Sequence, residues 1–278
     1  MKTNLMREDQ LATALTVGEL ERRLLELYPR EDAETWDRTG LVVGDPNEPV
    51  ASVAIALDPT YAALCACREF GANVLITHHP LFIDPPQSFV AFGSGGDAAG
   101  ARVHAAARWN VSCLSFHTTL DVSADGARML PWILDLDFDR IVVPAARDGR
   151  LGYGQLCSVR DDDLDLRGLA LRCKRVFGRT PRVWGDAGAP VERVVCATGS
   201  AGNVIEGALS QGADCLVCGE VRYHDALDAQ ERGLALVELG HDVSELPFCA
   251  ILAKAVASVG VDAESIHIYD QSSNWFTV

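Results

Sequence analysis

The sequence predicts an α/β protein made of two related lobes with mainly parallel or mixed sheets. Two observations lead to this prediction. Strand-like and helix-like segments alternate along most of the chain, which is typical of βαβ units. One strand–helix–strand segment also recurs at a fixed offset, which indicates an internal duplication.

The predicted elements follow from the spacing of apolar residues, taken in chain order. Residues 20–28 carry leucines at helical spacing between charged residues, so they predict an amphipathic helix. Short apolar runs predict buried strands at residues 53–57, 74–77 and 111–116. The segments that follow these strands predict helices at residues 61–70, 98–109 and 126–134. Later in the chain we expect a helix over residues 246–259 and a strand around His267.

The repeat aligns VAIALDPTYAALCACREFGANVLITHH with VVCATGSAGNVIEGALSQGADCLVCGE without a gap, at an offset of 141 residues from Val53 to Val194. Convergence of two common βαβ units is the alternative explanation. Duplication explains the ungapped match better. It predicts a first lobe from residues 1–135, completed by residues 237–278, and a second lobe from residues 136–236.

Composition excludes several classes of function. The chain has 278 residues and a formal net charge of −15, so a phosphate-binding surface for nucleic acid is not expected. No apolar run approaches the about 20 residues that span a bilayer. Glu8 and Asp9 stand where a signal peptide would carry basic residues. A cytoplasmic protein without membrane partners is therefore the expectation.

Nine cysteines are present, and Cys215 and Cys218 form a CxxC pair inside a strand-like run. Positions three apart on a strand face opposite sides, whereas a zinc knuckle needs both thiolates on one side. We therefore expect buried, structural cysteines, and a redox function is disfavoured.

Three predicted strand ends carry histidines or carboxylates, in the segments THHPLF, HTTLD and GHDVSE. Because active sites in parallel sheets form at the carboxyl edge, we expect these segments to meet in one cleft between the lobes. Their four imidazoles and two carboxylates suit two divalent ions with open positions for water. The candidate metal ligands are His78, His79, His117, Asp121, His241 and Glu245.

The spacing of these residues supports the prediction. His117 and Asp121 are four apart, as are His241 and Glu245, so each pair can share one side of a helical turn. His78 and His79 are neighbours, and on an extended backbone their side chains point to opposite sides, one toward each ion.

Two further segments border the expected cleft. Glu220 and His224 are candidate catalytic residues that orient ligands or transfer protons, and a solvated first helical turn is an equally good interpretation. The Gly-containing loop at residues 198–202 precedes a helix-like run and is a weak candidate for anion binding. For His104 and His267 we expect structural or solvent-facing positions.

The chain resembles the Nif-three-like dinuclear metal-centre hexameric proteins, also called GTP cyclohydrolase I type 2 homologues. The resemblance rests, from about residue 20 to the C-terminus, on the segments WDRTGLVVG, ALDPT, THHPLF, HTTLD, GADCLVCGE and GHDVSE. It implies that the six candidate ligands hold two metal ions, and that the chain forms a toroidal homohexamer. Arg38 and Thr119 stand where the family usually has Asn, and Cys218 where it has Thr, which changes no proposed ligand.

Two hypotheses for function follow. The first is a dinuclear-metal-dependent hydrolase that uses a metal-bridged water on a nucleotide or related small molecule, with GTP as the candidate that the resemblance supplies. The second is a metal-binding regulatory or interaction protein without turnover. The donor set suits Zn, Fe, Mn, Co or Ni, and affinity order alone does not choose among them.

Overall fold

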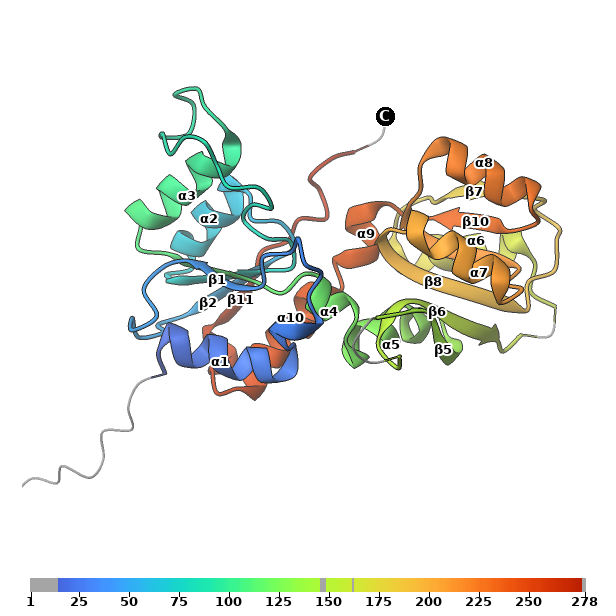
Figure 1. Cartoon of the computed structure of the whole chain (residues 1–278), viewed down its shortest axis with the longest axis horizontal. Helices are drawn as coiled ribbons and strands as arrows, with labels where there is room; N and C mark the ends of the chain where they lie inside the picture. Colours follow the sequence, from blue (N-terminus) through green and yellow to red (C-terminus); the bar gives the residue numbers. More distant parts are fainter. Residues whose placement is uncertain (1–14, 146–148, 162, 277–278) are drawn as a thin grey trace, which may run out of the picture.

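A computed structural model describes residues 15–145, 149–161 and 163–276, so Glu8 and Asp9 lie outside the described residues. The chain forms two sheets that lie at opposite ends of an elongated molecule, each with helices on both faces (Figure 1). Within the described ranges, no helix is long and apolar enough to cross a membrane.

The first sheet is mostly parallel, with strand order β1-β4-β3-β2-β11, and only β1 runs antiparallel to its neighbour. Its strands are β1 (Gly40–Val43), β2 (Val53–Ala56), β3 (Val74–Thr77), β4 (Ser112–Ser115) and β11 (Ile266–Ile268). Both faces are covered, so β2, β3 and β4 are buried along their whole length, as the unbroken apolar runs predict. One face carries α2 (Tyr61–Glu69) and α3 (Ala98–Arg108), and the other carries α1 (Val17–Leu27) and α10 (Phe248–Ser258) (Figure 1).

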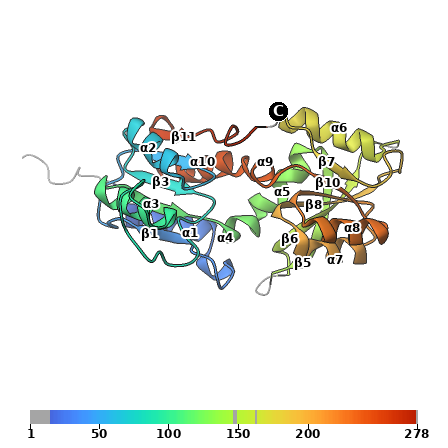
Figure 2. The same cartoon turned by 90° about the horizontal axis from the view of Figure 1, so that it is seen from above.

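The second sheet is mixed, with strand order β5-β6-β8-β9-β10-β7. Its strands are β5 (Leu136–Pro144), β6 (Gly152–Val159), β7 (Arg182–Trp184), β8 (Arg193–Ser200), β9 (Cys215–Glu220) and β10 (Ala235–Glu238). Apolar residues of α7 (Ile205–Ser210) and α8 (Tyr223–Glu231) pack on one face. The opposite face is covered by α5 (Ala124–Ile133) and α6 (Leu166–Phe177), and Figure 2 shows α6 across the sheet from α7 and α8.

The two sheets share a four-strand arrangement. The order β1-β4-β3-β2 of the first sheet matches β7-β10-β9-β8 of the second, with an antiparallel strand at the same edge of each. Val53 pairs with Val74, and their counterparts Val194 and Cys215 also pair, so the offset of the repeat is kept in the strand register. The predicted pair of related α/β lobes is confirmed.

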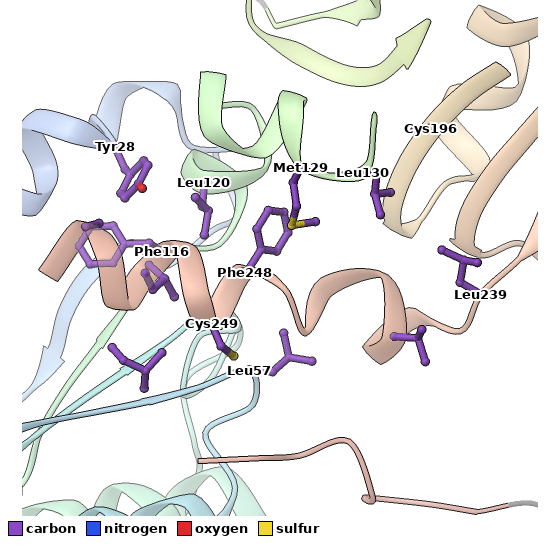
Figure 3. Close-up of a cluster of buried hydrophobic side chains, with 14 of the residues drawn as sticks. Tyr28, Leu57, Phe116, Leu120, Met129, Leu130, Cys196, Leu239, Phe248 and Cys249 are labelled. Atoms are coloured by element: carbon purple, nitrogen blue, oxygen red, sulfur yellow. The ribbon is translucent and has the colours of Figure 1, made fainter. Parts of the chain in front are cut away.

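One hydrophobic cluster joins the two sheets. Figure 3 shows Phe248 of α10 near its centre, between Tyr28 and Phe116 on the side of the first sheet and Cys196 and Leu239 on the side of the second. Met129 and Leu130 of α5 and Cys196 of β8 belong to the same cluster, and Phe248 is 0% exposed. This shared core holds the carboxyl ends of the strands from both sheets close together.

Several predicted boundaries differ from the structure because side chains near the helix ends act as caps. Thr16 accepts a hydrogen bond from the Glu19 amide, so α1 begins earlier than predicted, at Val17. The predicted helix at residues 246–259 begins later, as α10 at Phe248, and Pro247 separates it from a preceding short helix, α9 (His241–Glu245). The remaining short elements are η1 (Arg30–Asp32), α4 (Thr118–Asp121), η2 (Gly202–Val204) and η3 (Ala263–Ser265).

Predicted lobe boundaries at residues 135 and 237 stay a prediction. After β10 the chain returns through α10 to β11 of the first sheet. Strand β10 ends at Glu238 and therefore runs across the second predicted boundary.

Candidate metal centre

The paired histidines lie directly after β3, which ends at Thr77. The His78 side chain is fully buried, and its ring stacks near the Phe248 ring, with the centroids 4.6 Å apart. The rings of His78 and His79 lie 4.9 Å apart at an interplanar angle of 51°. The prediction that they point to opposite sides is wrong, because the strand ends before them and its alternation no longer applies.

The other two pairs of candidate ligands occupy equivalent places in the two lobes. His117 follows β4 and occupies the N-cap position of the single-turn helix α4, which ends at Asp121. His241 follows β10, and α9 runs from it to Glu245. Strands β4 and β10 hold the same position in the shared strand order, so the fold brings the two pairs toward each other from opposite lobes.

Donor atoms of these six residues converge in three overlapping groups, in each of which all donor atoms lie within 4.8 Å of one another. Glu245 is central, because its Oε2 lies 3.0 Å from His79 Nε2 and 3.2 Å from His241 Nε2. The groups are His78, His79 and His117; His79, His241 and Glu245; and His78, Asp121 and Glu245. Each group has a composition that could hold a metal ion.

Every histidine of the centre is oriented by a bond to its outer nitrogen, Nδ1. His78 Nδ1 donates to the Phe116 carbonyl oxygen at 3.1 Å, which fixes the proton on that nitrogen. The other three outer nitrogens face carboxylate oxygens at 2.8–3.2 Å, those of Asp58 (His79), Asp37 (His117) and Glu220 (His241). In the neutral form of each imidazole, Nε2 then directs its lone pair at the centre, as metal ligation requires.

Two buried atoms of the centre lack hydrogen-bond partners among the described residues. They are Nε2 of His78 and Oε2 of Glu245, the latter because the Nε2 atoms of His79 and His241 that face it carry no proton when these imidazoles are neutral and protonated at Nδ1. The nearest carboxylate oxygens to His78 Nε2 are those of Asp121, at 3.6 Å, and Glu245, at 3.8 Å, too far for hydrogen bonds. Buried polar atoms without partners are costly, and a cation between them would satisfy both. The residues therefore fit a metal ion.

The pKa values of three candidate ligands are raised, which shows that the centre favours bound positive charge. Burial disfavours the charged form of His79, yet the carboxylates of Asp58 and Glu245 raise its pKa to about 10. The Glu245 carboxylate raises the pKa of His241 to about 9. Burial and the charge of Glu245 raise the pKa of Asp121 to about 7. Protons bound here occupy the places that a metal would take, so metal binding releases protons.

A cavity of about 670 Å³ opens beside the centre, a size typical of sites for small ligands. Four of the candidate ligands form part of its wall: His117, Asp121, His241 and Glu245. Trp36, from the loop before β1, adds an aromatic side chain that is 48% exposed and lies edge-on to the His117 ring. Arg222, just before α8, is the only Lys or Arg that lines the cavity in the described part of the chain.

The two candidate catalytic residues lie in different surroundings. Glu220 is bonded to His241 Nδ1 at 2.9 Å, so it lies behind this ligand and orients it. His224 is exposed on α8, where its ring contacts Tyr223, and it is not part of the cavity wall. The structure thus brings Glu220, but not His224, to the centre.

Two amides of the predicted anion-binding loop already donate to acceptors within the protein. Gly199 N donates to Ser244 Oγ, and Ala201 N donates to the Glu220 carbonyl oxygen. A side chain at Gly199, whose φ is +55°, would place its Cβ 2.3 Å from Glu245 Oε1. The loop therefore supports the metal centre by close packing, and anion binding by these amides is not supported.

Sequence reasoning did not assign roles to Asp37 and Asp58. Both lie in loops far along the chain from the histidines that they orient. The only indication of a role in the sequence was that Asp37 lies in WDRTG and Asp58 in ALDPT, two of the segments on which the resemblance rests.

Comparison with known proteins shows the family of the chain. The family model of Duf34/NIF3 (NGG1p interacting factor 3) matches residues 15–274. The chain belongs to this family. A Streptomyces coelicolor member named GTP cyclohydrolase 1 type 2 homolog is 31% identical over 242 residues, which are 84% of this chain and 83% of the relative. A Helicobacter pylori protein named GTP cyclohydrolase 1 type 2 is 26% identical, over 87% of this chain and 92% of its own.

Solved structures of other bacterial proteins share the fold. A hypothetical protein of Staphylococcus aureus superposes with a TM-score of 0.84 at 23% identity, covering 95% of this chain and 99% of that one. A Bacillus cereus protein related to NIF3 superposes with a TM-score of 0.83 at 20% identity, with the same coverage. At these identities the likeness establishes the fold alone.

Proposed function

We propose that this Duf34/NIF3 protein is a metal-dependent hydrolase that acts on a nucleotide or a related small molecule. The observation that carries the proposal is the set of overlapping donor groups around Glu245 at the wall of a ligand-sized cavity. The names of the bacterial relatives, which include GTP cyclohydrolase 1 type 2, support the nucleotide class.

His78, His79 and Glu245 each belong to two of the three donor groups, as expected if two neighbouring ions are held by common residues. Two bound divalent ions would supply a water of lowered pKa and would polarise the bond that is attacked. The task of the chain is to hold each imidazole with Nε2 inward, through the bonds made by its Nδ1. Zn, Fe, Mn, Co and Ni all remain compatible with these donors.

The cavity wall matches the two chemical parts of a nucleotide. Trp36 exposes an aromatic surface on which a flat base can stack. Arg222 forms no ion pair within the described residues, so its guanidinium is available to a phosphate. Carboxylates also line the wall, including Glu34 and Asp225, so the cavity favours a ligand whose negative charge lies near Arg222 or the metals.

Metal analysis followed by a substrate survey tests the proposal. We expect about two divalent ions per chain, as the number of donors indicates. The metal-loaded protein should then release formate from GTP or cleave a phosphoester. Bound metal without any turnover across nucleotides and phosphoesters would favour a metal-binding regulatory protein instead.

A pair of histidine variants links turnover to the centre. His78→Ala removes a ligand and should lower both the metal content and the turnover, the latter by at least about 100-fold. His104→Ala is the matched control, because His104 lies on α3 and contributes to none of the donor groups. If His78→Ala and His104→Ala retain equal turnover, the assignment of the site is wrong.

A further inference from the structure

The chain after β11 connects the two halves of the metal centre. We call residues 269–275 the C-terminal strap. Figure 2 shows this segment leaving β11 and running past α10 toward the second sheet, to end near α6. Polar bonds anchor the strap at two places, one in each lobe.

The first anchor is Gln271, which is only 1% exposed. Its Oε1 accepts hydrogen bonds from the backbone amides of Leu57, at 2.8 Å, and Asp58, at 2.9 Å. Its Nε2 donates to the Asp58 carbonyl oxygen at 3.2 Å. One buried amide thus satisfies three backbone groups in the turn that follows β2, and no apolar side chain could replace it without leaving them unpaired.

This turn positions His79. Asp58 accepts from His79 Nδ1 at 2.8 Å, and the Leu57 carbonyl oxygen accepts from the His79 amide at 3.0 Å. Both the backbone and the ring of His79 are therefore held by the two residues that Gln271 clamps. A shift of the turn would move His79 Nε2 away from Glu245 Oε2, which lies 3.0 Å from it.

The second anchor lies beside His241. Arg179 donates to both carboxylate oxygens of Asp242, at 3.0 and 2.8 Å, and to the Ser272 carbonyl oxygen at 2.9 Å. The Arg179 guanidinium also lies 4.1 Å from the centre of the Trp275 ring. Trp275 Nε1 donates to Asp242 Oδ2 at 3.1 Å, so the strap is bonded to the residue next to His241.

We propose that the C-terminal strap positions the metal centre by fixing His79 through Gln271 and Asp58, and His241 through Trp275 and Asp242. Gln271 and Trp275 are positioning residues, since neither belongs to the donor groups. The inference rests on the proposed function only in requiring that the centre binds metal. The strap spans both lobes, so it couples the placement of one ligand from each of them.

The test measures Zn²⁺ affinity by competition with a chromophoric chelator, on full-length variants that urea unfolding shows to be folded without metal. Gln271→Ala should bind Zn²⁺ about 10- to 100-fold more weakly, as for other outer partners of metal ligands. Gln271→Glu keeps both acceptor bonds but loses the donor, so its affinity should fall between those of Gln271→Ala and the wild type. Trp275→Ala should show a smaller loss in the same direction. Asn274→Ala is the matched control, because the Asn274 side chain is exposed on the same strap.

The outcomes separate the two proposals. If the wild-type chain binds Zn²⁺ and both Gln271→Ala and Trp275→Ala bind it like Asn274→Ala, the positioning role is overturned while metal binding stands. Trp275 is 47% exposed, so its variant decides the question even if Gln271→Ala does not fold. A wild-type chain without Zn²⁺ affinity would overturn both.

Discussion

Replacing Asp37 with asparagine tests whether outer carboxylates decide which imidazole nitrogen faces the metal centre. The Asp37 side chain is fully buried, and its Oδ1 lies 3.2 Å from His117 Nδ1. Its Oδ2 accepts from the Thr118 amide at 3.0 Å and from the Thr118 hydroxyl at 2.6 Å. Burial opposes ionisation, but the bonds from His117 and Thr118 hold the pKa of Asp37 well below its usual range. Asp37 is therefore a carboxylate at neutral pH.

Asparagine has the same shape but replaces one oxygen with an N–H donor group. Placed at Oδ1, this group faces His117 Nδ1 and the Arg38 amide, which donates to Oδ1 at 2.7 Å. Nδ1 would then have to accept, which moves the imidazole proton to Nε2 and removes the lone pair that binds metal. Placed at Oδ2, the same group faces the Thr118 amide.

The orientation at Oδ2 leaves the half-buried Thr118 amide unpaired, which costs about 1–3 kcal/mol of unfolding free energy. The orientation at Oδ1 opposes the exposed Arg38 amide and disfavours the metal-binding tautomer of His117. Loss of the carboxylate should also weaken metal binding about 10- to 100-fold, which corresponds to about 1.4–2.8 kcal/mol. The assay is Zn²⁺ competition with a chelator, together with urea unfolding of the metal-free protein. Asp45→Asn is the control, since Asp45 is exposed and its Oδ1 accepts from the Asn47 amide, a bond that asparagine can keep. Equal affinity and equal unfolding free energy in the two variants would refute the reasoning.

Further predictions concern the packing around the centre and the pH dependence of stability. Gly199→Ala should displace Glu245 and lower Zn²⁺ affinity at least about tenfold, by analogy with other supporting contacts. Gly71→Ala is the control, because Gly71 also has a positive φ, of +69°, but a Cβ there would meet nothing within 4 Å, so this variant should lower only the free energy of unfolding. Equal Zn²⁺ affinities for the two alanine variants would contradict this. Phe248→Ala should lower the unfolding free energy by about 3–5 kcal/mol because it opens a cavity in the shared core; a loss below about 1 kcal/mol in urea unfolding would show that the core can close around the gap. Glu238 is buried, and although burial opposes ionisation, its bonds to the Arg182 guanidinium, the Trp184 indole and the Val221 amide lower its pKa. Its ionised form should stabilise the fold above the unfolded pKa of about 4.3, and this contribution should disappear as the pH falls through the lower folded value. The difference in stability between the wild type and Glu238→Gln should therefore shrink on acidification, and a difference that is constant from pH 7 to pH 3 would contradict the assignment.

The order of strands and helices was predictable because it depends on local patterns. Unbroken apolar runs predicted the buried strands β2, β3 and β4, which are covered on both faces. The fixed offset of the repeat predicted related lobes, and the register of the strands preserves it. Helix ends were less predictable, because caps such as Thr16 and breaks such as Pro247 act through one or two residues.

The convergence of the groups at the strand ends could be predicted from the sequence, whereas contacts that depend on long-range bonds could not. The spacing of His117 and Asp121 places both on one helical turn, which is a local property. Asp58 could not be assigned, because its bond to His79 joins two strand ends that lie together only in the folded sheet. The alternation of a strand does not extend past its last residue, which is why the rings of His78 and His79 converge.

By itself, the sequence determined which donor atoms the protein carries, their places at strand ends and the duplication that generates two lobes. The tertiary structure decided the rest: which nitrogen of each imidazole faces inward, and how Gln271 holds the turn behind His79. The physical reason is that periodicity and spacing act over a few residues, whereas a buried hydrogen bond needs two partners brought together from distant parts of the chain. Gln271 and Leu57 are 214 residues apart in the chain, and only the closed fold makes them neighbours.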